Sequence, residues 1–572
     1  MTREANAGTP KGGGKGSTTN GHLLAVVASN RPDTSGVLGP RGSPRGSGEF
    51  VKETVIVTSA SAGTLDAGTA VTANGPRDFP EDWDRVDWTR AEAEVRRLRQ
   101  RIFTASRAGE HRKVRSLQRL MLRSKANALV ATRRVTQINQ GRRTAGIDGL
   151  TALDGPDRVE LARWVQQHGH RSPALPVRRI FIPKANGKRR PLGIPVIADR
   201  ASQAVVLNAL EPEWEARFEP RSYGFRPGRG CHDAIEAIFT VCKGKDPTRA
   251  WVLDADLTAA FDRIDHDRLL DHLHGFPARE RVARWLRAGV IENRQFAPTT
   301  EGTPQGGVIS PLLMNIALHG MEAAAGVRYK PWRSTRGWSA PGTPVLIRYA
   351  DDLVALCHSR QQAEQIKERL TAWLAPRGLS FNEDKTQIVH LSEGFDFLGF
   401  TVRHYRNPGK LLITPSKAAV KRFRARLRAE VRSLHGAPAS AVISRLNPIL
   451  RGWAAYYRTA VSKRVFADID STLWWTMFKW GRRQHNTKTG QWIVDRYFGR
   501  FNPTRQDRWI FGDRETGAYL RKLSWMPIRR HQMVKAGASP DDRALADYWQ
   551  QRRRRRQPPD TPAPLPRHPR RP

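Results

Sequence analysis

The sequence predicts an α+β fold in which helices mix with short strands and a strongly basic helical region follows. Two apolar strand-like segments, residues 251–257 and 346–356, contain carboxylates, and helical periodicity dominates after residue 416. At 572 residues, the chain exceeds the size at which one hydrophobic core usually stops growing. We therefore expect more than one folded unit.

The charge of the chain indicates a polyanionic partner. There are 97 Lys and Arg against 54 Asp and Glu, a net charge of +43, and residues 417–572 alone carry 35 basic against 11 acidic residues. Nucleic acid is favoured over a membrane, because no apolar run approaches the roughly 20 residues that span a bilayer. The three cysteines lack zinc-ligand spacing and indicate no disulfide framework, which fits a reducing, cytoplasmic location.

The first ordered elements are expected to be helices. Residues 1–78 are rich in Gly, Ser, Thr, Ala and Pro, and we expect them to be disordered because they cannot bury enough apolar surface. Thr89 and Glu92 form a capping-box pattern. An apolar stripe then predicts a helix, with members Ala91, Val95, Leu98 and Ile102. A second helix is predicted from Val114, Leu117 and Leu120.

Strands are predicted next along the chain. Residues 177–195 form a basic hairpin pattern, in which two apolar segments flank a polar turn. Residues 251–257 and 395–402 each predict one apolar strand. Ser310 and Pro311 favour the start of one helix over residues 312–325.

The basic region is predicted to begin with a helix capped by Ser416. Its apolar stripe comprises Val420, Phe423, Leu427, Val431 and Leu434. Its cationic face comprises Lys417, Lys421, Arg424, Arg428 and Arg432. One face can pack on a core while the other contacts a phosphate backbone. Two further helices are predicted at residues 446–459 and 465–483.

Asp351 and Asp352 interrupt what otherwise reads as a pair of buried strands. Carboxylates beside an apolar core are costly unless they pair with cations or bind a metal, although Asp is also a common turn residue. Asp256 favours the metal site, because it too ends an apolar strand. Three carboxylates at one sheet edge could hold two Mg²⁺ ions, which would activate a 3′-hydroxyl and stabilise a leaving pyrophosphate.

Ordered blocks of the sequence resemble those of reverse transcriptases. Residues 349–352 read Tyr-Ala-Asp-Asp, and Phe261 follows Asp256 by five positions. The remaining blocks are residues 179–184, 190–195, 222–227, 305–311, 378–386 and 397–400. From about Trp83 to Trp549, the chain resembles the bacterial group II intron-encoded proteins, which are reverse transcriptases and maturases.

This resemblance implies a right-hand polymerase. Fingers and palm would occupy residues 79–416, with the catalytic Asp residues on an antiparallel palm sheet, and an α-helical thumb, called domain X in maturases, would occupy residues 417–500. Residues 501–572 would form a basic, DNA-binding-like segment with an Arg- and Pro-rich tail. Many relatives continue into an HNH endonuclease with paired cysteines. Because no cysteine follows Cys357, we expect that endonuclease and bottom-strand cleavage to be absent, so that the primer comes from another source.

The resemblance also implies the metal ligands. Asp256 and Asp351 would ligate both Mg²⁺ ions, Asp352 would support the site, and the backbone carbonyl of Leu257 would supply a further oxygen. Arg226 either binds template phosphate or braces the palm, and the structural role is preferred.

Five residues are implied to contact the incoming deoxynucleoside triphosphate. Lys184 and Arg190 would neutralise its phosphates, with a solvated hairpin tip as the alternative interpretation. Phe261 would exclude a 2′-hydroxyl, with plain core packing as the alternative. Gln305 would contact the nucleotide, and Gly306 would let the backbone approach it closely.

The basic helices are implied to bind RNA. Trp453 and Tyr457 are expected to be mainly buried, because aromatic stripes are more often core than ligand-binding surface. The residues expected to contact nucleic acid are Lys421, Arg424, Arg428, Arg451 and Arg458.

The implied function is that of an RNA-directed DNA polymerase and maturase. Such a protein binds its own group II intron RNA, assists splicing, and copies the intron into cDNA during retrohoming, with target DNA and a primer strand as further partners. Two alternatives stay open. One is an RNA-binding splicing maturase without polymerase activity, and the other is a stand-alone, retron-like bacterial reverse transcriptase.

Overall fold

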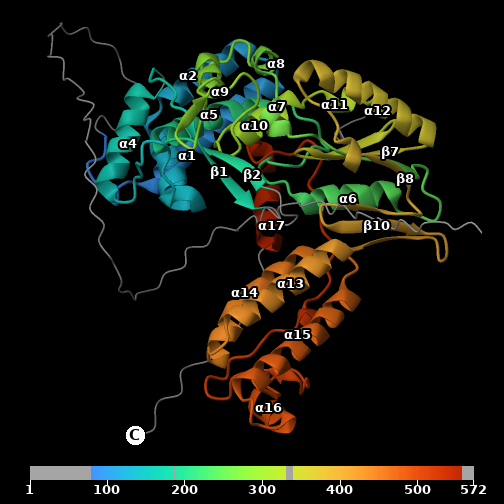
Figure 1. Cartoon of the computed structure of the whole chain (residues 1–572). Coiled ribbons are helices and arrows are strands. Elements are labelled where there is room, and N and C mark those ends of the chain that lie inside the picture. The colour runs from blue at the N-terminus through green and yellow to red at the C-terminus, as the bar shows by residue number, and fades with distance from the viewer. Residues whose placement is uncertain (1–78, 170, 184–188, 330–338, 557–572) are drawn as a thin grey trace, which may run out of the picture.

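A computed structural model describes residues 79–169, 171–183, 189–329 and 339–556. Residues 1–78 and Lys184 lie outside this part of the chain, and so do the predictions made for them. Figure 1 shows an upper part that contains the first helices and the larger sheets, and a lower group of helices, α13 to α16. None of the described helices is both long and apolar enough to cross a bilayer.

The first helices pack around α5 (Ile197–Glu215), which is buried along almost its whole length. They are α1 (Trp88–Arg107), α2 (His111–Arg123), α3 (Lys125–Arg133) and α4 (Gly155–His168). The predicted stripe of α1 is buried, as expected, but the cap is Asp87, which accepts a hydrogen bond from the Arg90 amide at 2.9 Å. The capping box was therefore wrong. Leu120 was also wrong as a core residue, since it is 51% exposed and Met121 is buried instead.

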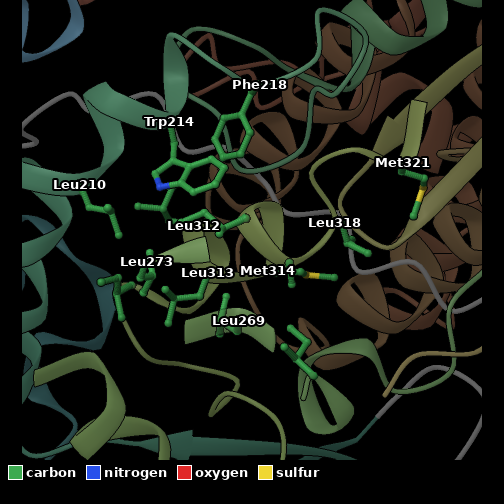
Figure 2. Close-up of a cluster of buried hydrophobic side chains, with 14 of the residues drawn as sticks. Leu210, Trp214, Phe218, Leu269, Leu273, Leu312, Leu313, Met314, Leu318 and Met321 are labelled. Atoms are coloured by element: carbon green, nitrogen blue, oxygen red, sulfur yellow. The ribbon is translucent and has the colours of Figure 1, made fainter. Parts of the chain in front are cut away.

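A second set of short helices completes this core. These are α7 (Ala260–Arg263), α8 (His266–His272), α9 (Arg279–Leu286), α10 (Ser310–Ala317) and α11 (Met321–Ala324). Figure 2 shows Leu210 and Trp214 of α5 beside Leu312 and Leu313 of α10. The single helix predicted over residues 312–325 was wrong. The chain breaks at Gly320, whose φ of 97° no helical residue adopts.

The predicted basic hairpin is confirmed by β1 (Val177–Pro183) and β2 (Arg189–Ile194), which pair antiparallel. β4 (Val290–Glu292) runs parallel to β1, and β5 (Gln295–Ala297) follows at the edge of this sheet. The hairpin projects from the upper part toward the middle of the molecule (Figure 1).

The central sheet has the order β6-β7-β3-β8 and all its neighbours are antiparallel. Its strands are β6 (Val345–Tyr349), β7 (Asp352–Cys357), β3 (Trp251–Asp256) and β8 (Gln387–His390). Because side chains alternate along a strand, Leu253 and Leu353 face α12 (Arg360–Leu374), and Val252 and Val354 face α6 (Cys231–Cys242). Helices thus cover both faces and fix the strand register.

A smaller sheet follows, with the order β11-β10-β9. Its strands are β9 (Phe395–Phe397), β10 (Phe400–Tyr405) and β11 (Lys410–Pro415). The single strand predicted over residues 395–402 was wrong, because Leu398 and Gly399 have φ values of 49° and 80° and turn the chain into a hairpin.

The lower helices are α13 (Lys417–Ser433), α14 (Ala439–Tyr457), α15 (Lys463–Gln484) and α16 (Gly490–Tyr497). The Ser416 cap is confirmed, since its hydroxyl accepts from the Ala419 amide at 3.2 Å. Phe423 is buried and stacks on Trp453 with ring centroids 4.5 Å apart. The predicted burial of Trp453 and Tyr457 is confirmed. α14 begins seven residues before its predicted start, directly after Pro438.

The C-terminal segment returns to the upper part of the molecule. β12 (Phe498–Gly499) and β13 (Ile510–Phe511) pair beside α15, and α17 (Ala546–Arg556) then lies near α6 (Figure 1). Arg99 of α1 contacts both carboxylate oxygens of Asp541 at 2.9 and 2.7 Å. Arg552 of α17 contacts Asp233 of α6 at 2.6 Å. Through Asp541 and Arg552, the C-terminal segment therefore contacts the first helix and α6.

Candidate active site

The register of the central sheet brings the predicted carboxylates together. Asp256 at the end of β3 lies directly opposite Asp352 at the start of β7. Asp351 sits in the turn between β6 and β7, next to Ala350, whose φ is 60°. The three carboxylates therefore share one end of the sheet, as their positions at strand ends predicted.

The segment over residues 222–227 packs against the backbone of this turn. The Tyr223 amide donates to the Arg348 carbonyl at 2.9 Å, and the Asn315 side-chain amide donates to the Gly224 carbonyl at 2.9 Å. A Cβ at residue 224 would lie 2.2 Å from the amide nitrogen of Ala350. Only glycine allows this close approach, so Gly224 fixes the position of the Asp351 turn.

Arg226 of the same segment has a structural role in this chain. It is 5% exposed, and its guanidinium contacts both oxygens of the Glu215 carboxylate at 2.9 Å. It also donates to the carbonyls of Glu219 and Ser222. A buried guanidinium with these contacts braces the palm, as preferred from the sequence.

Burial and repulsion between neighbouring charges disfavour the charged forms of Asp351 and Asp352. Burial raises the pKa of Asp352 well above its usual range, and the charges of Asp351 and Asp256 raise it further. Burial and the Asp256 charge also raise the pKa of Asp351, while Arg190 and Lys385 lower it in part. Two positions before Asp256 on the same face of β3, burial raises the pKa of Asp254 to about 7. This end of the sheet thus requires positive charge if its carboxylates are to ionise together.

Lys385 supplies part of that positive charge and was not predicted as a site residue. Its ammonium lies 2.6 Å from Asp256 Oδ2. It is the last residue of the 3₁₀ turn Glu383–Lys385, and the Asn382 amide directly before this turn donates to the Asp256 carbonyl at 2.8 Å. The only sequence signal was its place in the 378–386 block.

The carboxylates fit a hard divalent cation. They offer oxygen donors in a partly buried site where their charges repel one another, which is the donor chemistry that Mg²⁺ prefers. Within the described ranges, no three Asp, Glu, His or Cys side chains are already arranged to enclose a metal ion. Leu257, the predicted backbone ligand, is buried directly after Asp256 and forms a bridge with Phe381.

Three of the five predicted nucleotide contacts, Arg190, Gln305 and Gly306, lie where the hairpin packs on the loop before α10. Arg190 of β2 donates through Nε to the side-chain oxygen of Gln305 at 2.7 Å, and the Gly193 amide donates to the Gln305 carbonyl at 2.7 Å. Gly306 has a φ of 124°, and a Cβ there would lie 2.4 Å from the Gly193 carbonyl oxygen. The need for glycine at residue 306 therefore follows from the packing of this loop against β2.

Phe261 lies at the boundary between core and site. It is 6% exposed and belongs to the buried cluster around α5 and α10. Its ring meets the ring of Phe225 edge to face, with centroids 6.0 Å apart. Phe225 is 45% exposed and has a φ of 58°, an unusual conformation for a bulky residue. Phe225 was not singled out from the sequence.

The predicted RNA contacts lie on two helices. Lys421 and Arg428 of α13 are exposed, as is Arg451 of α14. Arg424 and Arg458 are half-buried. Burial, with a further contribution from the charge of Arg529, lowers the pKa of Arg458. The structure thus leaves three of the five cations on the surface.

Three family models match the chain. They are the N-terminal domain of reverse transcriptase over residues 83–165, reverse transcriptase (RNA-dependent DNA polymerase) over residues 182–402, and the group II intron maturase-specific domain over residues 420–498. Together they cover the first helices, the central sheet and the lower helices.

Curated relatives agree with these models. The chain is 38% identical over 314 residues to Protein YkfC of Escherichia coli (strain K12), covering 50% of this chain and 82% of that protein. It is 31% identical over 327 residues to the group II intron-encoded protein LtrA of Lactococcus lactis subsp. cremoris, covering 47% of this chain and 54% of LtrA. It is 24% identical over 377 residues to maturase-like protein 1 of Euglena gracilis, covering 65% of this chain and 76% of that protein. The match thus spans about half the length of LtrA. With these models and relatives, the chain belongs to the family of group II intron reverse transcriptases and maturases.

Proposed function

We propose that this reverse transcriptase binds its own group II intron RNA, assists its splicing, and copies it into DNA during retrohoming. The observation that carries the polymerase part is the position of Asp256 opposite Asp352, with Asp351 in the adjoining turn. Membership in the family implies dependence on a divalent metal. Target DNA and a primer strand are the further proposed partners.

Asp256 and Asp351 would hold two Mg²⁺ ions, with the Leu257 carbonyl as a further ligand. When bound, the ions would activate the primer 3′-hydroxyl and stabilise the leaving pyrophosphate. Asp352 would support the site through its contact with Asp256. The closeness of Lys385 to Asp256 supports this assignment, because it shows that the carboxylate end already attracts a cation.

The incoming deoxynucleotide would lie between the basic hairpin and the carboxylates. Lys184 and Arg190 would contact its phosphates, and Gln305 and Gly306 would line its position. The influence of Arg190 on the pKa of Asp351 supports this placement, because the hairpin cation acts on the carboxylate turn. Phe261 would limit the space at the sugar 2′ position.

We propose the same division of the chain that the sequence indicates. Residues 79–416 would form fingers and palm, residues 417–500 the thumb or domain X, and residues 501–572 the basic C-terminal segment. Intron RNA would contact the cationic residues of the thumb, namely Lys421, Arg424, Arg428, Arg451 and Arg458. The surface position of three of these supports the proposal.

Extension of a primed RNA template with deoxynucleotides tests the polymerase assignment. The double variant Asp351→Ala/Asp352→Ala should lose extension and retain splicing of the intron RNA. The matched control is Asp384→Ala, which removes an exposed carboxylate from the turn before β8 and should extend like the unchanged protein. Unchanged extension by the double variant would refute the metal assignment. Absence of extension in the unchanged protein, with splicing intact, would favour a maturase without polymerase activity.

A further inference from the structure

A cavity of about 540 Å³ opens between α15 and the segment that follows α16. Five aromatic side chains line it, Trp474 and Trp475 from α15 and Phe498, Trp509 and Phe511 from the β12–β13 region. Its volume lies within the roughly 300–1,000 Å³ of typical ligand pockets. The cavity belongs to the lower helices and lies on elements other than those that carry the carboxylates.

Two tryptophans at this cavity remain exposed to solvent. Trp475 and Trp509 are each 58% exposed, although tryptophans in folded proteins are highly buried on average. Both meet Trp474 edge to face, with centroids 4.8 and 6.1 Å apart. Trp474 itself stacks on Phe478, with centroids 5.5 Å apart and an interplanar angle of 7°. Trp475 and Trp509 are therefore the rings with surface left for a ligand.

The cavity wall also contains an unsatisfied hydrogen-bond donor. The indole nitrogen of Trp474 is buried and has no hydrogen-bond partner among the described residues. The Asp470 carboxylate is already occupied, because it accepts from the Leu523 and Ser524 amides at 2.8 and 2.9 Å. Neither the buried Trp474 nitrogen nor the Asp470 carboxylate is therefore free to contact a ligand, which leaves the exposed rings as the binding surface.

The charge around the cavity favours an anionic ligand. Arg521 and Lys522 line it, and Arg521 is exposed. Lys522 is paired with Asp507 at 2.8 Å, which leaves Arg521 as the lining cation best placed for an added phosphate. An apolar peptide would use the aromatic walls but would gain nothing from this cation. A nucleotide uses both, because its base stacks and its phosphate is anionic.

We propose that this cavity binds one unstacked base of single-stranded RNA. The base would stack on Trp475 and Trp509, and Arg521 would contact the adjoining phosphate. The inference rests on the proposed RNA binding by this protein and deepens it, because it adds a contact to a base between the thumb helix α15 and the C-terminal segment, which carries Trp509 and Arg521. Double-stranded RNA would not use the cavity, since its bases are already stacked.

The test compares the full chain with the double variant Trp475→Ala/Trp509→Ala. The probe is a fluorescein-labelled single-stranded RNA of about 20 nucleotides, longer than typical single-strand binding sites. Loss of base stacking on these rings should weaken binding by about 5-fold or more, measured by fluorescence anisotropy. The slope of log affinity against log salt should not change, because the rings neutralise no phosphate. Affinity for a duplex of the same RNA should also be unchanged.

Two further variants separate stacking from misfolding. Trp475→Phe/Trp509→Phe keeps aromatic rings and should restore most of the affinity for the single strand. Ser471→Leu adds aliphatic bulk to an exposed residue that lines the cavity and should weaken single-strand binding without removing any contact or adding a stacking ring. Circular dichroism and thermal unfolding identify any variant that fails to fold, in which case Ser471→Leu decides.

Three results would overturn the proposal. The first is unchanged single-strand affinity in both the alanine double variant and Ser471→Leu. The second is an equal loss for single-stranded and duplex RNA by folded protein. The third is loss of self-association, measured by sedimentation, with RNA affinity intact, which would assign the cavity to a second copy of the chain. If the unchanged protein binds neither RNA, the proposed RNA-binding function itself fails.

Discussion

Lys385 contributes positive charge at the carboxylate site. Its ammonium contacts Asp256 directly, and its charge lowers the raised pKa of Asp351 in part. The two residues of the ion pair are 129 positions apart in the chain. Sequence patterns could identify each as part of a block, but a contact over this separation depends on how β3 and the turn before β8 pack.

The variant Lys385→Met should weaken extension and shift its pH dependence. Loss of a charge-assisted contact worth about 1.5–3 kcal/mol corresponds to a rate loss of roughly 10- to 100-fold. Removing the cation raises the pKa of Asp351 further, so its charged form is lost at higher pH. The acid limb of the pH–rate profile should therefore move to higher pH.

The matched control for this prediction is Lys367→Met, which breaks the pair between Lys367 and Glu383 at 2.7 Å. Lys367 lies on α12, and no contact places it against the carboxylates. The pH–rate profile of Lys367→Met should coincide with that of the unchanged protein. If the acid limb of the Lys385→Met profile stays at its original pH, the electrostatic role of Lys385 is contradicted.

At the scale of elements, Gly224 links the segment over residues 222–227 to the β6–β7 turn. The variant Gly224→Ala places a Cβ 2.2 Å from the Ala350 nitrogen, so the turn must move. Because a misplacement of about 1 Å can cost about 100-fold in rate, extension should fall by that order while RNA affinity stays unchanged. Gly230→Ala is the control, since nothing lies within 4 Å of its added Cβ. Equal extension by both variants would contradict this account.

The exposed face of α13 gives a second prediction for an element. The double variant Lys421→Ala/Arg428→Ala should lower RNA affinity and reduce the slope of log affinity against log salt by about 2, since each phosphate contact contributes about one. Both side chains are exposed, so thermal unfolding should be unchanged. A reduced affinity with the original slope would indicate that these cations do not contact phosphate.

The helices and strands could be predicted where a local pattern marks them, either hydrophobic periodicity or a strong N-cap residue. Ser416 and the apolar stripe after it are of this kind, and so are the strands that end at Asp256 and begin at Asp352. The breaks at Gly320 and Gly399 were missed, because an apolar run continues on both sides and only the positive φ reveals the turn. The cap of α1 was misplaced because Asp87, two residues before Thr89, is also a favourable N-cap residue, and its side chain accepts from the Arg90 amide.

At the scale of the whole molecule, the C-terminal segment contacts the first described helix, α1. Arg99 and Asp541 are separated by 442 positions, and their side chains are 14% and 6% exposed. Burial opposes the charge of Arg99, but Asp541 and Glu211 raise the pKa of its guanidinium above its usual value. The sequence indicated a basic, DNA-binding-like segment and gave no sign of this contact, because pairing of such distant residues has no local pattern.

The variant Asp541→Ala should destabilise the whole fold. Removing one partner of a buried ion pair costs about 3–5 kcal/mol, and because Glu211 still contacts Arg99 we expect the lower end, about 3 kcal/mol. Denaturant unfolding measures the change. Asp82→Ala, which breaks the exposed pair with Arg85, should change stability by less than about 0.5 kcal/mol. A similar small change for Asp541→Ala would mean that the C-terminal segment does not stabilise the fold.

We expect the end of the central sheet to act as a metal-dependent polymerase site. Single-nucleotide incorporation on a primed RNA template by Asp256→Asn tests it most directly, because Asn keeps the shape of the side chain and removes its charge. We expect the incorporation rate to fall by at least about 100-fold, since each bound ion stabilises the charge of the transition state by several kcal/mol. Asp384→Asn should incorporate at the original rate. Incorporation by Asp256→Asn within about twofold of the original rate, a difference of less than about 0.5 kcal/mol, would contradict the account.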